Sequence, residues 1–459
     1  MQMDDVLDNF PPLKDHDTAA RLLSQLCPDS VKNDIEVDLG SPESFACLLY
    51  KHPDLFRRVE DARVSRDPED FETIWRTCTN YLSLAKMAIR SLSRPDKVPL
   101  ILQRISANLN TLINGEAKQV IWTVNENGVD DTSDIEKLAL SSFSKKREPP
   151  SMLLHELGSF QKDPKLKERV QRLFRKGQNK FLVNASGTGK TRLLYEGLCQ
   201  HWGLYITSHA DEREARALDV TLSRRIHDDG GFEKLLPHES CLAFEPILAK
   251  NREIAARRFS ATLLAHLLVF RDFLKASSAA KRGEAVLKRR WLLAQLACQL
   301  LDRSDPFQEI LVAIEWEPLE YINEQLLKVI KDIQTLLPES ARTDGFFVVI
   351  DEANVAIREI WSSQNSGSGP YPALKEIIRT WRDCLTSFEG VSITFVVAGT
   401  QIPQSYFDPS SQEWSSWRWS SDTGAFNDPE IQKQYVLSFL PPPLLQTPRV
   451  QALFRRIWD

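Results

Sequence analysis

The spacing of apolar residues divides the chain into a helical first part and a second part in which helices alternate with apolar strands. Apolar side chains recur every three or four residues in Phe71–Leu92 and Val98–Ile113, which predicts helices. We therefore expect an α-helical N-terminal domain over residues 1–140. Residues 141–152 combine a basic run with a Pro-Pro pair, which cannot continue a helix, and are expected to be a linker.

Four short apolar runs beyond residue 153 have the composition of strands. They are Lys180–Asn184, Trp202–Ser208, Phe346–Ile350 and Val391–Ala398. Continuous apolar runs of this kind are typical of central strands in a parallel sheet. Because helical patterns lie between them, we expect an α/β domain with a mainly parallel sheet over residues 153–459. Residues 211–340 are almost wholly helical in pattern and are expected to form an insertion in that domain.

Composition and charge exclude several classes of protein. The chain has 459 residues, of which 42% are hydrophobic and 26% charged, as in ordinary globular proteins rather than disordered or collagen-like ones. The net charge of −5 provides no overall basic field, so nucleic acid is not the expected partner. No apolar run approaches the roughly 18–20 residues that span a bilayer. The acidic N-terminus does not resemble a signal peptide, and we expect an intracellular protein, cytoplasmic or nuclear, without a membrane segment.

The first candidate for chemistry is the segment Asn184–Thr191 (NASGTGKT), which follows an apolar strand and precedes an amphipathic helix. It matches the phosphate-binding pattern G-x-x-x-x-G-K-[ST] except at its first position. Backbone amides converge on a phosphate only where side chains are absent, which Gly187 and Gly189 provide. Lys190 can reach the β- and γ-phosphates of a nucleotide, and the Thr191 hydroxyl can coordinate Mg²⁺.

Polar side chains also follow two other predicted strands. At the end of the third strand, Asp351 would hold Mg²⁺ through its water shell and Glu352 would polarise the attacking water. The alternative is that both acids cap the following helix. Thr400 or Gln401, after the last strand, could sense the γ-phosphate if that strand lies between the other two; a plain strand-to-loop turn is the alternative.

These three elements together resemble P-loop NTPases of the class with an additional catalytic glutamate, which includes the AAA+ and STAND families. More narrowly, Phe181–Leu198 (FLVNASGTGKTRLLYEGL) resembles fungal P-loop NTPases related to the NTPase modules of Crinkler-type effectors. The resemblance covers about residues 155–459 and implies a three-layer core with ATP and Mg²⁺ as cofactors. It further implies Mg²⁺-dependent ATP hydrolysis that drives a conformational switch in a signalling or effector-like protein.

The resemblance implies a role for each matching position. Glu352 would be the catalytic base, assisted by Lys190 and by Thr400 as first sensor. Thr191 and the Walker B residue Asp351 would hold Mg²⁺. The nucleotide-binding positions of the Walker A loop would be Asn184, Ala185, Ser186, Gly187, Thr188, Gly189, Lys190, Thr191 and Arg192.

The chain departs from that pattern in three respects. Asn184 replaces the first glycine; asparagine tolerates positive φ better than most residues, so we expect it to hold a similar turn. Lys190 and Asp351 are 161 positions apart, hence the inferred insertion. Only 59 residues follow Thr400, so the helical lid domain of such NTPases is expected to be missing. The alternatives are a non-hydrolysing nucleotide-binding scaffold and, more remotely, a helicase-like nucleic-acid motor.

Arginines and tryptophans provide candidates for contacts with partners. Arg379, Arg382 or Arg418 could act on the nucleotide of a neighbouring copy in a homo-oligomer, although each also suits a solvated surface. The segment Trp414–Trp419 (WSSWRW) suits either docking of a protein partner or packing beneath a lid. Basic runs at 281–282 and 288–290 are most simply solvated helix faces. Residues 1–140 are expected to recognise a protein partner that the sequence does not identify.

Overall fold

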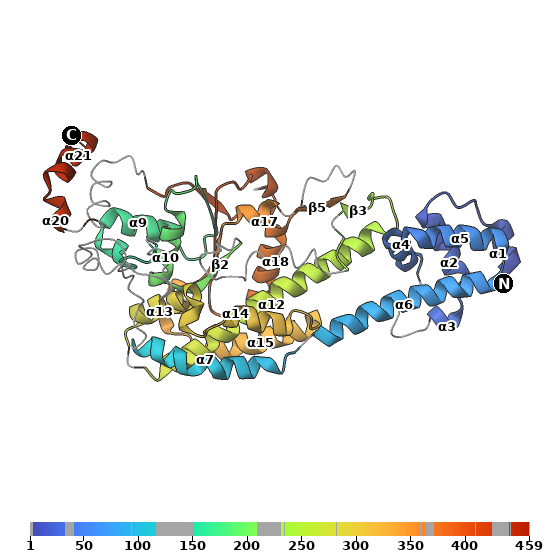
Figure 1. The fold of residues 1–459 in the computed structure, drawn as a ribbon, viewed down its shortest axis with the longest axis horizontal. Helices are drawn as coiled ribbons and strands as arrows, with labels where there is room; N and C mark the ends of the chain where they lie inside the picture. The colour runs from blue at the N-terminus through green and yellow to red at the C-terminus, as the bar shows by residue number, and fades with distance from the viewer. Residues whose placement is uncertain are drawn as a thin grey trace, which may run out of the picture.

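A computed structural model gives the fold of the chain. It describes residues 3–32, 41–92, 94–115, 151, 153–208, 231–233, 235–280, 282–358, 360–363, 371–408, 410–424, 440 and 442–458, and every structural statement below concerns these residues. The molecule is elongated, with the N-terminal helices at one end and the C-terminal helix at the other (Figure 1).

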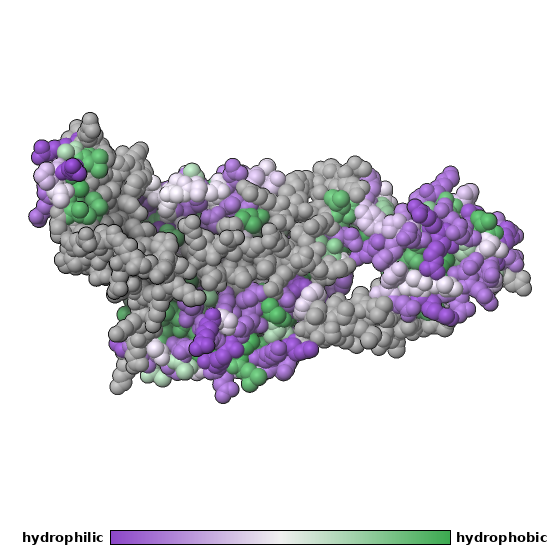
Figure 2. Space-filling view, in the orientation of Figure 1, coloured by the Kyte–Doolittle hydropathy of each residue, from purple (hydrophilic) through white to green (hydrophobic). Residues whose placement is uncertain are grey.

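The N-terminal end is a cluster of helices. They are α1 (Met3–Asn9), α2 (His16–Leu26), α3 (Asp29–Lys32), α4 (Pro42–Lys51), α5 (Pro53–Ser65) and α6 (Pro68–Leu92). Asp15 and Ser41 cap α2 and α4, because their side-chain oxygens accept hydrogen bonds from amides of the first turn. The visible surface of this cluster is mostly hydrophilic (Figure 2), while Phe45 and Leu22 are fully buried within it. α6 confirms the helix predicted from Phe71.

Residues 235–344 are mainly helical, as predicted. They form a short strand, β3 (Leu235–Leu236), and the helices α12 (Phe244–Ser278), α13 (Glu284–Leu296), α14 (Pro306–Ile314), α15 (Leu319–Leu336) and α16 (Glu339–Asp344). At 1.5 Å per residue α12 is about 52 Å long, and it runs from the N-terminal cluster into the central body (Figure 1). Tyr50 on α4 donates a hydrogen bond to Leu235 O at 3.0 Å, which ties the cluster to the start of this region.

The helix predicted over Val98–Ile113 is confirmed as α7 (Lys97–Asn114). It packs against α12, α13 and α14, which all follow the predicted boundary at residue 140. The predicted boundary at residue 140 and most of the linker 141–152 lie outside the described residues. The division of the chain at that point therefore stays a prediction.

The central body contains a five-stranded parallel sheet. Its strands are β1 (Lys180–Val183), β2 (Trp202–Thr207), β4 (Phe346–Asp351), β7 (Ile393–Gly399) and β8 (Arg418–Ser420), in the order β2-β4-β7-β1-β8. The predicted α/β class is thus confirmed, and β7 lies between β1 and β4. A second small sheet contains β3, β5 (Ile360–Ser363) and β6 (Tyr371–Pro372).

Helices cover both faces of the sheet, and side chains alternate between them. Phe346, Val348 and Ile350 of β4 pack into the core that contains α12 and α18 (Ala373–Leu385). Phe347 and Val349 pack on the other face, against α9 (Pro164–Leu173) and α10 (Lys190–Gln200). The result is a helix–sheet–helix arrangement of three layers.

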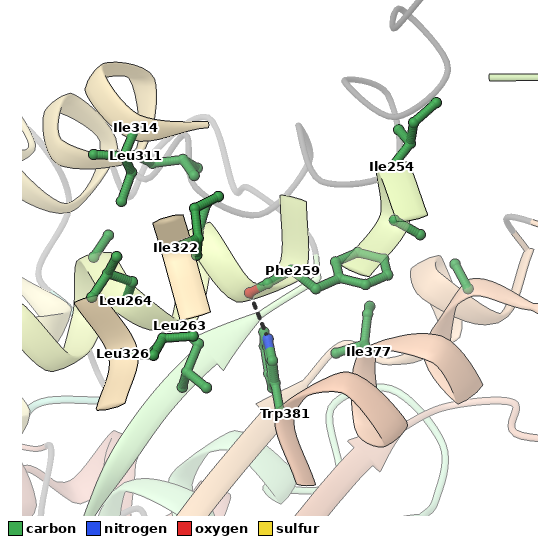
Figure 3. Close-up of a cluster of buried hydrophobic side chains, with 14 of the residues drawn as sticks. Ile254, Phe259, Leu263, Leu264, Leu311, Ile314, Ile322, Leu326, Ile377 and Trp381 are labelled. Atoms are coloured by element: carbon green, nitrogen blue, oxygen red, sulfur yellow. Dashed lines mark hydrogen bonds between the residues drawn. The ribbon is translucent and has the colours of Figure 1, made fainter. Parts of the chain in front are cut away.

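The larger core lies between α12, α15 and α18 (Figure 3). Trp381 of α18 is fully buried there and donates a hydrogen bond from its indole Nε1 to Phe259 O of α12 at 2.8 Å. Leu263 of α12 and Leu326 of α15 fill the space beside it. Burial of an aromatic ring with its polar atom paired fixes the two helices against each other.

The tryptophan segment forms part of the core, which corrects its interpretation as a docking patch. Trp414 and Trp417 are only 4% and 5% exposed. The ring of Phe181 in β1 stacks on those of Trp417 and Trp419, with centroids 4.5 Å apart in both pairs. The segment therefore contributes to β8, the outer strand beside β1, and its rings cover Phe181 instead of facing a partner.

The remaining described elements are short or terminal. They are α17 (Asn354–Arg358), α20 (Pro442–Leu445), α21 (Pro448–Trp458) and the 3₁₀ turns at Ser159–Lys162, Cys298–Leu300 and Gln404–Tyr406. Among the described helices, none combines the length and the apolar character needed to cross a bilayer.

Candidate functional site

The three predicted strand ends meet at one edge of the sheet. Asn184 N, just beyond β1, donates a hydrogen bond to Gly399 O at the end of β7 at 3.3 Å. Ala353 N, just beyond β4, donates to Ala398 O of β7 at 2.9 Å. Because adjacent parallel strands bring their carboxyl ends together, segments about 160 and 215 positions apart form a single polar cluster.

The loop from residue 185 to 189 leads from β1 into α10. Gly187 and Gly189 have φ values of +77° and +87°, in the region that L side chains rarely adopt. Thr188 Oγ1 donates a hydrogen bond to Ala185 O at 2.9 Å and closes the turn. No side chain among the described residues caps the helix at Gly189, so the first amides of α10 face the loop. Such amides, with the positive end of the helix dipole, favour an anion.

Lys190 folds back over this loop. Its Nζ donates hydrogen bonds to Asn184 O at 2.8 Å and Ala185 O at 2.7 Å, and the residue is 5% exposed. Burial lowers the pKa of Lys190, while the charges of Glu352 and Asp351 raise it. The Lys190 ammonium group is thus held against the backbone of the loop.

Thr191 and Asp351 are in direct contact. Thr191 Oγ1 donates a hydrogen bond to Asp351 Oδ2 at 2.8 Å, although the residues come from different elements. Asp351 is 1% exposed; burial raises its pKa, and hydrogen bonds from Thr191, the Glu352 amide and Tyr205 oppose that shift. A hydroxyl and a carboxylate are the hard oxygen ligands that suit Mg²⁺.

Glu352 follows Asp351 with an unusual backbone. Its φ of +49° is left-handed, which is uncommon for a residue other than glycine and often marks a functional site. The Asp351 carboxylate accepts hydrogen bonds from Thr191, Tyr205 and the Glu352 amide, which hold it toward the loop and β2. The alternative role of the two acids as caps of α17 is not tested by these contacts.

Thr400 lies beside the start of α17, where its amide donates a hydrogen bond to Asn354 Oδ1 at 3.2 Å. It directly follows β7 and is half-buried, whereas Gln401 is exposed. The structure thus places Thr400 nearer to the acidic segment through the backbone. Among the described residues, neither the Thr400 nor the Gln401 side chain makes a hydrogen bond that would single it out as the sensor.

Asn184 does not hold the turn that was predicted. Among the described residues, positive φ outside glycine occurs at Arg66, Glu156 and Glu352, so Asn184 is not left-handed. Its Nδ2 instead donates hydrogen bonds to Ser421 O at 2.7 Å and Thr423 Oγ1 at 2.8 Å. The physical reason for asparagine is therefore its amide side chain, which anchors the loop to the segment after β8.

Arg192 is not brought into the cluster. Its guanidinium donates to His155 O at 2.6 Å, to Glu156 O at 3.0 Å and to Glu196 Oε1 at 2.7 Å. Glu196 is fully buried and also accepts a hydrogen bond from Gly158 N at 2.8 Å. Arg192 therefore fastens the segment before α9 to α10, and a direct role in nucleotide binding finds no support in these contacts.

The other arginines considered from the sequence are held by the protein itself. Arg379 and Arg382 both contact Glu413, at 3.1 Å each. Arg418 donates to the backbone oxygens of Ser415 and Trp417. None of these contacts supports a role for the three arginines at the nucleotide of a neighbouring copy.

The basic runs near residue 285 serve the end of α7. Arg282 and Arg290 donate hydrogen bonds to Asn114 O and Ile113 O, the last carbonyls of that helix. Cations at a helix C-terminus satisfy its free carbonyls and its dipole. Lys288 is buried and pairs with Glu284 at 3.4 Å, while Lys281 lies outside the described residues.

A separate hollow of about 880 Å³ lies between α7, α12 and α15. Its walls include Leu102, Leu264 and Tyr321, and none of its lining residues belongs to the polar cluster. The hollow and the candidate site are therefore distinct features of the molecule.

Comparison with known proteins adds no relative: no protein-family model matches the chain, and no curated protein or solved structure is significantly similar to it.

Proposed function

We propose that the chain is a P-loop NTPase that binds ATP with Mg²⁺ at the loop 184–191 and hydrolyses it. The observation that carries this proposal is the 2.8 Å hydrogen bond between Thr191 and Asp351 at the carboxyl edge of the parallel sheet. It joins the two proposed metal ligands, one from the glycine loop and one from the acidic strand. The position of β7 between β1 and β4 supports the same conclusion, because the proposed role of Thr400 requires it.

Each residue of the cluster has a chemical role in this proposal. The loop amides and Lys190 would bind the phosphates, and Thr191 and Asp351 would hold Mg²⁺, which neutralises phosphate charge when bound. Glu352 would accept a proton from the water that attacks the γ-phosphate. Lys190 would exchange its bonds to Asn184 O and Ala185 O for phosphate oxygens, so the loop already holds the ammonium where the anion would arrive.

The nucleotide would act as a conformational switch in a signalling or effector-like protein. Support comes from the position of α12, which reaches from the central body to the N-terminal helices (Figure 1). Movement of the layers around the site would thus reach the helices proposed to bind a protein partner. We also propose that the chain is related to Crinkler-type NTPase modules and that it assembles into a homo-oligomer.

The first experiment is titration of the full chain with a fluorescent ATP analogue, with Mg²⁺ and with EDTA. We expect saturable binding that Mg²⁺ strengthens, and at least a tenfold loss of affinity in Lys190→Ala. Lys328→Ala is the matched control, because Lys328 is an exposed lysine on α15. Absence of binding in the wild type, or equal binding in both variants, would contradict the proposal.

A second experiment separates hydrolysis from binding. Glu352→Gln is expected to lower phosphate release by about 10²–10⁴-fold while the affinity for the analogue is retained. Glu320→Gln, at an exposed position of α15, is the control. Binding without turnover in the wild type would instead support the non-hydrolysing scaffold.

A further inference from the structure

A tyrosine outside the predicted site contacts the proposed metal ligand Asp351. Tyr205 lies on β2, is 4% exposed, and donates a hydrogen bond from its hydroxyl to Asp351 Oδ2 at 3.0 Å. In the register of the sheet Tyr205 is opposite Val349, two residues before Asp351 on the same face. A long aromatic side chain can bridge this diagonal between neighbouring strands.

The backbone of Tyr205 is fixed from outside the sheet. β2 is an edge strand, and α13 lies along its open side: Tyr205 N donates a hydrogen bond to Gln295 Oε1 at 2.8 Å. Trp291 Nε1, one turn earlier on α13, donates to Gly203 O at 2.7 Å. Buried side chains of the helix thus take the place that a sixth strand would occupy. These hydrogen bonds fix the position of Tyr205 along the direction of the strand.

The hydroxyl of Tyr205 restricts the Asp351 carboxylate. Oδ2 accepts hydrogen bonds from both Thr191 and Tyr205, and Oδ1 accepts one from the Glu352 amide at 2.9 Å. With both oxygens engaged, rotation of the carboxylate would break at least one buried hydrogen bond, which is costly in a site this enclosed. Groups that hold a metal ligand in this way commonly tune the affinity of the site.

We propose that Tyr205 is a positioning residue of the Mg²⁺ site, placed by Gln295 of α13 so that its hydroxyl orients the Asp351 carboxylate toward the metal. The inference rests on the proposed function and adds a residue to it. It also gives the helical region 235–344 a defined contact with the site, through one side chain of α13. Thr191 would remain the ligand from the loop, and Tyr205 would touch neither metal nor nucleotide.

The test compares Tyr205→Phe with the wild type in the analogue titration, across a range of Mg²⁺ concentrations. We expect the Mg²⁺ concentration for half-maximal enhancement to rise about 10–100-fold, with unchanged affinity in EDTA. Tyr195→Phe is the control, because it removes a hydroxyl from the neighbouring ring, whose centroid is 5.1 Å from that of Tyr205. A merely structural role of Tyr205 would lower the unfolding temperature and both affinities together.

A second variant tests the link to α13. Gln295→Met removes the acceptor for Tyr205 N and leaves the phenol in place, so the Mg²⁺ midpoint should shift in the same direction by less. In the double variant the shift should not exceed that of Tyr205→Phe, since the effect of Gln295 passes through the hydroxyl. Additive shifts would overturn that link.

The outcomes distinguish this inference from the proposed function. If the wild type binds the analogue with Mg²⁺ and Tyr205→Phe has the same Mg²⁺ midpoint, the inference is wrong and the proposed function stands. If the wild type binds nothing, the proposed function fails before Tyr205 is examined, and the inference fails with it.

Discussion

The two faces of the central sheet differ in the size of their apolar cores and in what their buried carboxylates contact. The face under α12 and α18 is filled by large apolar groups, among them Trp202, Phe346 and Trp381, and the carboxylates buried on that side, Glu315 and Glu376, pair with arginines of the helices. The face under α10 has a smaller apolar core, beside which Asp351 and Glu196 are buried with specific hydrogen-bond partners. Apolar contacts tolerate many neighbours, whereas a buried carboxylate requires particular donors. The larger apolar core thus lies on the first face, and the proposed nucleotide site lies beside the second.

The largest expected effect belongs to the apolar face. Trp381→Ala should lower the free energy of unfolding by about 3–5 kcal/mol, because it leaves a cavity between α12 and α18. Trp381→Phe should cost less, since it keeps a ring and loses the bond to Phe259 O. Unfolding in urea measures both changes. Nucleotide affinity of the folded variant should stay near that of the wild type; a large loss of affinity would show that the faces are not independent.

The sequence predicts much of the sheet because its strands are continuous apolar runs. β1, β2, β4 and β7 lie within two residues of the predicted strands at each end. β8 was missed, because a strand of three residues within a tryptophan-rich segment has no measurable period. The separation of the two faces was also beyond prediction, since alternation disappears where both faces are apolar.

The candidate site could be predicted only as far as local patterns reach. Lys190, Thr191 and Asp351 each follow or end a strand, and parallel strands align such ends. Tyr205 depends on the register between β2 and β4 and on Gln295, which is 90 positions away, so no local pattern reports it. The available signal was general: a buried tyrosine needs a partner for its hydroxyl.

A smaller effect is expected on the face under α10, where that helix closely approaches the ring of Phe174 at the end of α9. A Cβ added at Gly197 would lie 1.9 Å from Cε2 of Phe174, whose ring is confined by His201 and Phe347. Gly197→Ala should therefore cost about 1–3 kcal/mol despite the better helix propensity of alanine. Gly283→Ala, whose Cβ would meet no described atom within 4 Å, should be nearly neutral. Equal unfolding midpoints for both variants would mean that this face is loosely packed.

The smallest expected effect is a pH dependence of stability that arises on the face under α10. His201 stacks on Phe174 at 5.7 Å between ring centroids, and burial, assisted by the charge of Lys288, lowers its pKa from 6.5 to about 4. Below about pH 6.5 the His201 imidazole becomes protonated in the unfolded chain, whereas in the folded chain it stays neutral until about pH 4. The free energy of unfolding therefore decreases as the pH falls across that interval. His201→Phe keeps the ring and removes the titration. Relative to the variant, the wild type should lose about 1 kcal/mol between pH 7.5 and 5.5. If the wild type and His201→Phe instead lose stability equally as the pH falls, His201 is protonated at the same pH in the folded and unfolded chains. Water would then reach its ring in the folded protein.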